Sequence, residues 1–216
     1  MNTIDRNELA LAAALTAVAG FVDAVAFIHL GGYFISFMSG NTTQMSSSFV
    51  EGMTSTALRC LSIIGLFVVG VMAGSVIRRI AVGERGRTAV LCSVTTLLGV
   101  SAVCAATWSG FVALMVGAVA MGTLNSVFEK SGEVSVGLTY MTGTLVKAAQ
   151  RLVDAAFGGP RWVWARHFLL WSAMAVGALA GAGAYRELDM SAMWLPFVIV
   201  ALLTVWATRI TAGQKV

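Results

Sequence analysis

The stretch that decides the fold is GFVDAVAFIHLGGYFISFMSGNTTQ, residues 20–44. It opens with an apolar run that contains one carboxylate, Asp23, and this run is broken by the glycine pair at 31–32. A polar segment follows, in which the side-chain oxygen of Ser39 or Asn41 can accept a hydrogen bond from the first turn of a helix. The pattern therefore predicts an interrupted helix: an apolar span, an extended segment, and a new helix capped by Ser39 or Asn41.

The chain around this stretch is strongly apolar. Of its 216 residues, 58% are hydrophobic and 11% are charged, and the mean hydropathy is +0.85. Soluble domains have roughly 45–50% apolar and about 25% charged residues, so this composition excludes a soluble enzyme, a disordered protein and a disulfide scaffold. The three cysteines lie in apolar runs without a CxxC spacing, which indicates buried thiols and no metal site. We expect an all-α polytopic membrane protein.

Six apolar runs have about the 20 residues that cross a bilayer core. They are Leu9–Ile28, Ala57–Ile77, Thr88–Trp108, Phe111–Phe128, Val163–Ala184 and Ala192–Thr208. Two further stretches, 31–50 and 134–157, mix apolar with polar residues. If both return to the side from which they came and the N-terminus is cytoplasmic, only Arg59 and Arg186 of the 14 basic residues lie outside. Because this agrees with the positive-inside rule, we expect six transmembrane helices with both termini in the cytoplasm. A variant with seven or eight crossings is the alternative.

The two halves of the chain resemble each other, since three short motifs recur in the same order. The pairs are Gly20–Asp23 with Gly122–Asn125, Phe37–Gly40 with Tyr140–Gly143, and the GxxxG motifs Gly70–Gly74 with Gly177–Gly181. We expect the GxxxG glycines to pack against other helices. Each repeat, residues 9–87 and 111–209, holds three spans, so the second repeat must be inverted relative to the first. Inverted repeats with a broken or re-entrant helix are typical of transporters, whose site lies near the membrane midplane.

Asp23 is the leading functional candidate. An ionisable side chain at membrane depth costs about 2.5–3.5 kcal/mol on insertion scales, which favours a functional role. Asp23 would then carry a coupling proton or coordinate a cation. The structural alternative is that its carboxylate accepts the N–H groups freed near Gly40. The corresponding Asn125 is neutral, which suits a single proton or cation site.

The two helix starts complete the predicted site, because their free N–H groups suit an anionic or carbonyl-bearing solute. The predicted binding residues are Asp23, Ser39, Gly40, Asn41, Asn125, Thr142, Gly143 and Thr144. Further along each helix, polar residues at helical spacing predict a pore or mouth; they include Gln44, Lys147, Arg151 and Asp154. The alternatives are interfacial loops without a ligand and amphipathic helices that lie in the membrane interface.

The segments GFVDAVAFIHLGGYFISFMSGNTTQ at 20–44 and GLTYMTGTLVKAAQRL at 137–152, together with the six apolar runs, are similar to the YoaK family over nearly the whole chain. The resemblance implies a bacterial inner-membrane protein with about six spans. The family is of unknown function, so the resemblance supplies neither a substrate nor a reaction.

No HExxH, GxSxG or P-loop motif is present, so we expect no enzyme and no cofactor. The basic residues are scattered at the ends of segments, which argues against a nucleic-acid partner. The leading hypothesis is a small-solute transporter in the lipid bilayer, coupled to protons or cations through Asp23. A channel of the same architecture and a non-transporting scaffold are the alternatives. Whether the GxxxG motifs make a homodimer is left open.

Overall fold

The computed structural model describes residues 6–81, 84–130, 133–134 and 137–213. Within these ranges the regular secondary structure is helical apart from one short ribbon. The first half contains the helices α1 (Arg6–Leu30), α2 (Met38–Val50), α3 (Thr54–Ile80) and α4 (Glu84–Thr107). The second half contains α5 (Gly110–Leu124), the 3₁₀ helix η1 (Asn125–Phe128), α6 (Met141–Ala156), α7 (Val163–Leu188), the 3₁₀ helix η2 (Asp189–Met193) and α8 (Trp194–Gly213). The ribbon pairs β1 (Glu129–Lys130) with β2 (Glu133–Val134) in antiparallel register.

Five stretches of the described chain are long and apolar enough to cross a membrane. They are Arg6–Leu30, Thr54–Ile80, Arg85–Thr107, Gly110–Phe128 and Val163–Arg209. The last stretch has 47 residues and contains both α7 and α8, joined by η2. The architecture is therefore that of a polytopic helical membrane protein, as the composition predicted.

Helices α1 and α5 lie at the centre of the bundle. α1 packs along α7, and α5 packs between α3 and α4. Leu15 and Val22 of α1 and Leu114 of α5 are completely buried, whereas Met72 of α3 and Leu179 of α7 are 63% and 75% exposed. Soluble monomers rarely expose large contiguous apolar surfaces, so this outward-facing apolar surface is suited to lipid.

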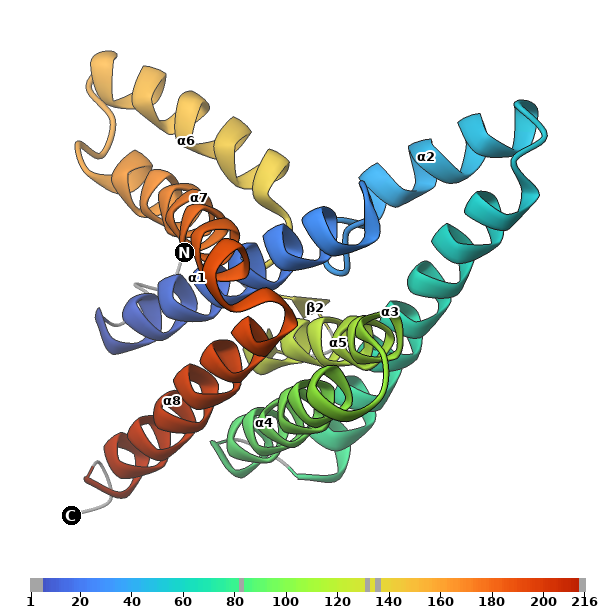
Figure 1. The fold of residues 1–216 in the computed structure, drawn as a ribbon. Coiled ribbons are helices and arrows are strands. Elements are labelled where there is room, and N and C mark those ends of the chain that lie inside the picture. Colours follow the sequence, from blue (N-terminus) through green and yellow to red (C-terminus); the bar gives the residue numbers. More distant parts are fainter. Residues whose placement is uncertain (1–5, 82–83, 131–132, 135–136, 214–216) are drawn as a thin grey trace.

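Helices α2 and α6 are the two elements that the interrupted stretches form. In Figure 1 both begin near the centre of the molecule and run outward to different corners. α2 then packs along α3, and α6 packs along α7. The centre of the bundle therefore receives the N-terminal ends of two helices from opposite halves of the chain.

Side-chain contacts show which helices run in the same direction. His29 Nδ1, near the end of α1, lies 3.0 Å from the Tyr185 hydroxyl, near the end of α7. The Ser75 hydroxyl, near the end of α3, donates to Glu129 Oε2, which follows α5 and η1, at 2.7 Å. α1 therefore runs in the same direction as α7, and α3 runs in the same direction as α5.

The ion pair between Arg87 and Glu8 relates these two pairs to each other. Arg87 Nη2, at the start of α4, lies 2.6 Å from Glu8 Oε1, at the start of α1. Because α4 begins where α3 ends, the end of α3 lies beside the start of α1. The pair α3 and α5 consequently runs opposite to the pair α1 and α7, so the segments that follow α1 and α5 leave from opposite ends of the bundle.

Candidate functional site

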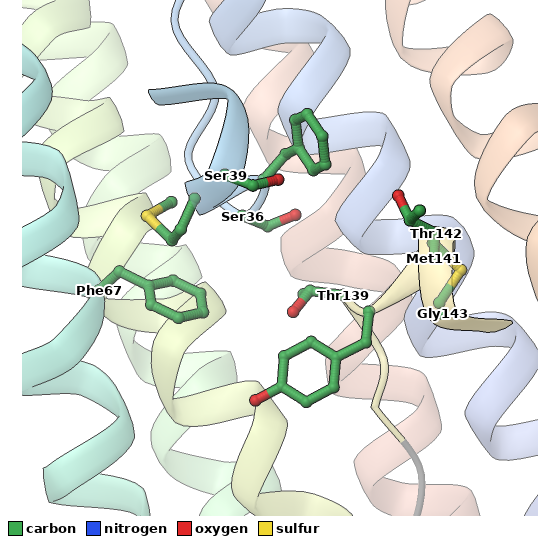
Figure 2. A pocket seen from close by; sticks show the side chains of 10 residues that line it. Ser36, Ser39, Phe67, Thr139, Met141, Thr142 and Gly143 are labelled. Atoms are coloured by element: carbon green, nitrogen blue, oxygen red, sulfur yellow. The ribbon is translucent and has the colours of Figure 1, made fainter. Parts of the chain in front are cut away.

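A cavity of about 260 Å³ lies where α2 and α6 begin. It is lined by residues 36–39, by residues 139–143, and by Phe67 of α3. Figure 2 shows Phe67 on one side and Thr142 and Gly143 on the other, with Ser36 and Thr139 between them. The cavity is therefore built by the two helix starts that the sequence predicted as the site, together with the segment that precedes each start.

The segment before α2 reaches the cavity because the chain turns back sharply at the end of α1. Gly31 and Gly32 have φ angles of 74° and 118°, which side chains other than glycine rarely adopt. The turn is closed by a hydrogen bond from Gly32 N to Phe27 O at 2.8 Å. After it, Ile35 and Ser36 are buried against α1, with exposed fractions of 0% and 3%.

Asp23 of α1 holds this segment in place. Its Oδ1 accepts hydrogen bonds from Ile35 N at 2.8 Å and from Ser36 N at 2.7 Å. Its Oδ2 accepts a hydrogen bond from Ser36 Oγ at 2.6 Å. Asp23 is only 4% exposed and does not line the cavity; Ser36 lies between the carboxylate and the cavity. Asp23 therefore does accept backbone N–H groups of the broken element, as the structural alternative predicted, but the donors are Ile35 and Ser36 instead of groups near Gly40.

Asn125 makes the corresponding contact in the second half. Its Oδ1 accepts a hydrogen bond from Thr139 Oγ1 at 3.1 Å, and its Nδ2 donates to Met121 O at 3.0 Å. Asn125 is 1% exposed, and Thr139 lines the cavity. Each half thus places a buried polar residue behind a hydroxyl that faces the cavity. The sequence analysis missed these two hydroxyls, although Ser36 and Thr139 immediately precede the motifs that it aligned.

The predicted helix caps are wrong. α2 begins at Met38 and α6 begins at Met141, and neither start has a side-chain cap. Because α2 starts one residue before Ser39, both Ser39 and Asn41 lie inside the helix, where a capping side chain cannot reach the first-turn N–H groups. Asn41 Oδ1 accepts from Phe34 N at 3.0 Å and Asn41 Nδ2 donates to Phe34 O at 2.6 Å, so this side chain clamps the preceding segment.

The uncapped starts leave backbone donors near the cavity. The first helical hydrogen bonds are those from Asn41 N to Phe37 O, at 3.4 Å, and from Thr144 N to Tyr140 O, at 3.0 Å. The N–H groups of residues 38–40 and 141–143 therefore precede the hydrogen-bond ladder. All of these residues except Gly40 line the cavity. The N-terminal ends of two helices thus give this space a partial positive potential without a charged side chain in its lining.

The remaining predicted residues lie away from this cavity. Thr144 donates its hydroxyl to Tyr140 O at 3.0 Å and is absent from the lining. Gln44, Lys147, Arg151 and Asp154 lie further along α2 and α6 and are also absent from it. Arg151 pairs with Asp154 at 2.9 Å on an exposed surface. Their role at a pore or mouth stays a prediction.

The predicted packing glycines bring helix backbones into direct contact. A Cβ added at any of them would collide with a carbonyl oxygen or a side chain of the neighbouring helix. The carbonyl oxygens are those of Val119 for Gly70, Thr123 for Gly74, Ala17 for Gly177 and Phe21 for Gly181, and two further glycines, Gly20 and Gly122, meet those of Met174 and Phe67. The contacts of α1 with α7 and of α5 with α3 correspond one to one: each α5 residue is 102 positions after its α1 counterpart, and each α7 residue is 107 positions after its α3 counterpart.

Comparisons with known proteins place the whole chain among membrane proteins without an assigned activity. The family model described as "Protein of unknown function (DUF1275)" matches residues 11–206. The UPF0700 transmembrane protein RA0705 of Rhizobium meliloti (strain 1021) is 36% identical over 207 residues, which are 94% of this chain and 87% of that protein. The UPF0700 transmembrane protein YoaK of Bacillus subtilis (strain 168) is 24% identical over 225 residues, 97% of each chain. No solved structure matches.

Proposed function

Since the chain belongs to the DUF1275 family of uncharacterised transmembrane proteins, we propose from the geometry of its own cavity that it is a small-solute transporter. Membership confirms the resemblance to the YoaK family. The observation that carries the proposal is the cavity of about 260 Å³ between the starts of α2 and α6. Helix breaks at membrane depth are tolerated where they are buried in protein or line a water-filled space, and a solute site in such a space is the arrangement of many transporters.

The proposed topology has six crossings, with α7 and α8 counted separately. α1, α4 and α7 would run outward and α3, α5 and α8 inward, so that both termini lie in the cytoplasm of a bacterial cell. α2 and α6 would each re-enter from opposite sides. The opposite directions of the pairs α1–α7 and α3–α5 support this topology, as does the Arg87–Glu8 pair between the starts of α4 and α1.

The proposal includes the inverted repeat. Two observations support it: the one-to-one correspondence of the glycine contacts, and the equivalent bonds of Ser36 to Asp23 and Thr139 to Asn125. Under an inverted repeat, rocking the bundle that contains α1 and α7 against the bundle that contains α3 and α5 exposes the shared cavity alternately to each side of the membrane. A cavity between the starts of α2 and α6, lined by residues of both halves, is what such a motion needs.

The chemistry of the cavity favours a solute that accepts hydrogen bonds. Free N–H groups at the two helix starts attract an anionic or carbonyl-bearing group. Asp23 lies one hydroxyl away from the cavity, through Ser36, and it is the residue that would carry a coupling proton. The proposal requires no catalytic step and no cofactor.

Water access to the cavity tests the proposal most directly. Cysteines replace Ser39 and Thr142, one at a time, in a protein whose Cys60, Cys92 and Cys104 have been changed to alanine. We expect both to react with membrane-impermeant thiol reagents in reconstituted vesicles. Val69→Cys is the matched control, because Val69 is 54% exposed on the outer face of α3 and would contact lipid, where it reacts only with apolar reagents. Cysteines at 39 and 142 that stay unreactive would favour a non-transporting scaffold.

Recording from planar bilayers separates a carrier from a channel. A carrier moves solute in a saturable manner and gives no unitary currents. Unitary currents from the purified protein would contradict the carrier and favour a channel of the same architecture.

A further inference from the structure

We propose that Ser36 passes the protonation state of Asp23 to the cavity, so that a small monocarboxylate is bound together with one proton. The inference rests on the proposed transporter function and deepens it: it names the residue that couples the proton to the solute, and it names the class of solute.

Two backbone groups determine which oxygen of Asp23 takes the proton. Oδ1 accepts hydrogen bonds from the N–H groups of Ile35 and Ser36, at 2.8 and 2.7 Å, so it remains an acceptor in both protonation states. Oδ2 accepts one hydrogen bond, from Ser36 Oγ at 2.6 Å. A proton on the carboxyl group therefore resides on Oδ2, the atom that faces the Ser36 hydroxyl.

The Ser36 hydroxyl connects this oxygen to the cavity. While Asp23 is ionised, the hydroxyl donates to Oδ2 and presents only lone pairs to the cavity. When hydronium in the cavity gives a proton to Ser36 Oγ, the original hydroxyl proton moves to Asp23 Oδ2. One O–H bond of hydronium and the old Ser36 O–H bond break, and new O–H bonds form on Ser36 and Asp23. Ser36 stays neutral, and its hydroxyl now donates into the cavity.

In the second half of the molecule, Thr139 provides the hydroxyl that corresponds to Ser36, but its partner Asn125 carries no titratable group. Thr139 Oγ1 donates to Asn125 Oδ1 at 3.1 Å, and the Asn125 amide is oriented by its own hydrogen bond to Met121 O. An amide does not titrate, so the Thr139 hydroxyl presents lone pairs to the cavity at every pH. The relay therefore carries one proton in each cycle.

In the described part of the chain, no charged side chain bonds to the Asp23 carboxylate in place of Ser36. The helix α5, which packs against α1, has no ionisable residue. The ionisable residues toward the same end of α1 include His29, Tyr33, Tyr185, Arg186, Glu187 and Asp189, and Arg59 near the start of α3, whose guanidinium lies over the Phe111 ring. α8 contributes only Arg209, near its far end. His29 bonds to Tyr185, Arg186 pairs with Glu187, and none of the described residues other than Ile35 and Ser36 bonds to the Asp23 carboxylate.

The lining of the cavity indicates the solute class. At about 260 Å³ the cavity is slightly smaller than typical ligand pockets. Hydroxyl groups such as those of Ser36 and Thr142 share it with apolar groups such as the Phe67 ring, and no lining residue is charged. This lining fits a molecule with one anionic head and a small apolar body. The carboxylate head gains a donor from Ser36 when Asp23 is protonated, and it faces lone pairs of Ser36 when Asp23 is ionised.

Proton-driven uptake into proteoliposomes tests the relay, with radiolabelled L-lactate, pyruvate and butyrate as probes. We expect saturable uptake of at least one probe, driven by an inward proton gradient. Ser36→Ala should lower this uptake at least tenfold and remove its dependence on pH, and Ser36→Thr should restore both. The matched control, Thr139→Ala, should keep the pH dependence. Asp23→Asn should abolish accumulation but keep exchange, because the Asn amide nitrogen would donate to Ser36 and hold its hydroxyl toward the cavity.

An infrared titration of the reconstituted protein reads the relay without any solute. We expect a protonated-carboxyl band that is missing in Asp23→Asn, is shifted in Ser36→Ala, and is unchanged in Thr139→Ala. An unshifted band in Ser36→Ala, or uptake by that variant with the pH dependence of the parent protein, overturns the relay and leaves the transporter standing.

The remaining outcomes separate the two proposals. If none of the three probes is taken up although cysteines at 39 and 142 react with impermeant reagents, the solute class is overturned and the transporter stands. If those cysteines do not react, both proposals fail.

Discussion

The two halves of the protein place equivalent segments beside the same cavity, but they hold them differently. The segment before α2 is fixed by three hydrogen bonds to Asp23 and by two between Asn41 and Phe34. Among the described residues of the segment before α6, the hydrogen bond from Thr139 is the one that fixes the segment at Asn125. Within the part of the chain that the structure describes, the first half is therefore the braced side of the cavity, and the second half is the side with fewer hydrogen bonds of this kind.

The packing around the two helix starts also differs, and it is tighter at the start of α2 than at the start of α6. The rings of Phe34 and Phe37 pack edge-to-face at 5.3 Å, and a Cβ on Gly40 would lie 2.7 Å from Phe37 Cδ1. A Cβ on Gly143 would meet nothing within 4 Å. Regions with few packing contacts and few hydrogen bonds open at low free-energy cost. We therefore expect the start of α6, and not the start of α2, to move when solute enters.

The largest difference between the halves should appear when the buried polar anchors are removed. Asp23→Ala leaves two backbone N–H groups and one hydroxyl without their hydrogen-bond acceptor. Since each buried donor without a partner costs about 1–3 kcal/mol, we expect the free energy of unfolding to fall by about 4 kcal/mol. Asn125→Ala leaves the Thr139 hydroxyl and Met121 O without their hydrogen-bond partner, and should lower the free energy of unfolding by about 2 kcal/mol. Unfolding in mixed micelles, followed by circular dichroism, measures both. Equal losses would show that the halves are braced equally.

The glycine contacts should show no such difference. Gly70→Ala and Gly177→Ala each force a methyl group against a backbone carbonyl of the neighbouring helix, and we expect each to cost about 1–3 kcal/mol. The matched controls are Gly65→Ala on α3 and Gly183→Ala on α7, where the space is open and where alanine should stabilise the helix by about 0.5–1 kcal/mol. Costs at Gly70 and Gly177 that differ by more than about 2 kcal/mol would contradict the equivalence of the two interfaces.

The clamp on the first segment should give a smaller effect. Asn41→Ala removes two hydrogen bonds with Phe34 and should cost about 1–2 kcal/mol, since a net hydrogen bond contributes about 0.5–1.5 kcal/mol. It should also speed amide hydrogen exchange in residues 33–37, measured by mass spectrometry. Thr144→Ala removes only a bond to the carbonyl of Tyr140, the residue that immediately precedes its own helix, and is the control. Unchanged exchange in Asn41→Ala would mean that Asp23 alone orders the segment.

The smallest effect should come from the glycine at the start of α6. Gly143 lies in the first turn of α6 and not in the middle of the helix, so the gain expected for alanine at Gly65 or Gly183 does not apply in full. We expect Gly143→Ala to change the free energy of unfolding by less than about 0.5 kcal/mol. Gly40→Ala should cost about 1 kcal/mol or more, because the Phe37 ring must shift. Thermal unfolding of both variants side by side checks this order, and the reverse order would place the looser helix start in the first half.

The sequence predicted the elements better than the contacts between them. The apolar runs that it marked as spans coincide with α1, α3, α4, α5 with η1, α7, and η2 with α8. The breaks after α1 and α5 were expected from glycine and hydroxyl residues, because these residues act on the backbone locally. The family resemblance was confirmed as well.

The contacts that build the site were beyond local reasoning. The caps at Ser39 and Asn41 were wrong because a shift of one residue in the helix start changes which groups a side chain can reach. Ser36 and Phe67 were missed because they reach the cavity only through tertiary packing. The signal for Ser36 was a polar residue in an apolar segment that aligns with Thr139 in the other half of the chain.

The packing of α1 on α7 and of α3 on α5 joins the two halves of the chain, and this has a consequence for how the protein is synthesised. Phe67 of α3 meets Gly122 of α5, but Gly20 of α1 must wait for Met174 of α7. At roughly 5–20 residues per second of synthesis, Gly122 is made about 3–11 s after Phe67, but Met174 is made only about 8–31 s after Gly20. During the longer interval, the glycine face of α1 has no permanent neighbour in the bilayer. α7 is therefore the helix that covers this face of α1, and chains that end before it are the ones that membrane proteases and chaperones should recognise as unfinished.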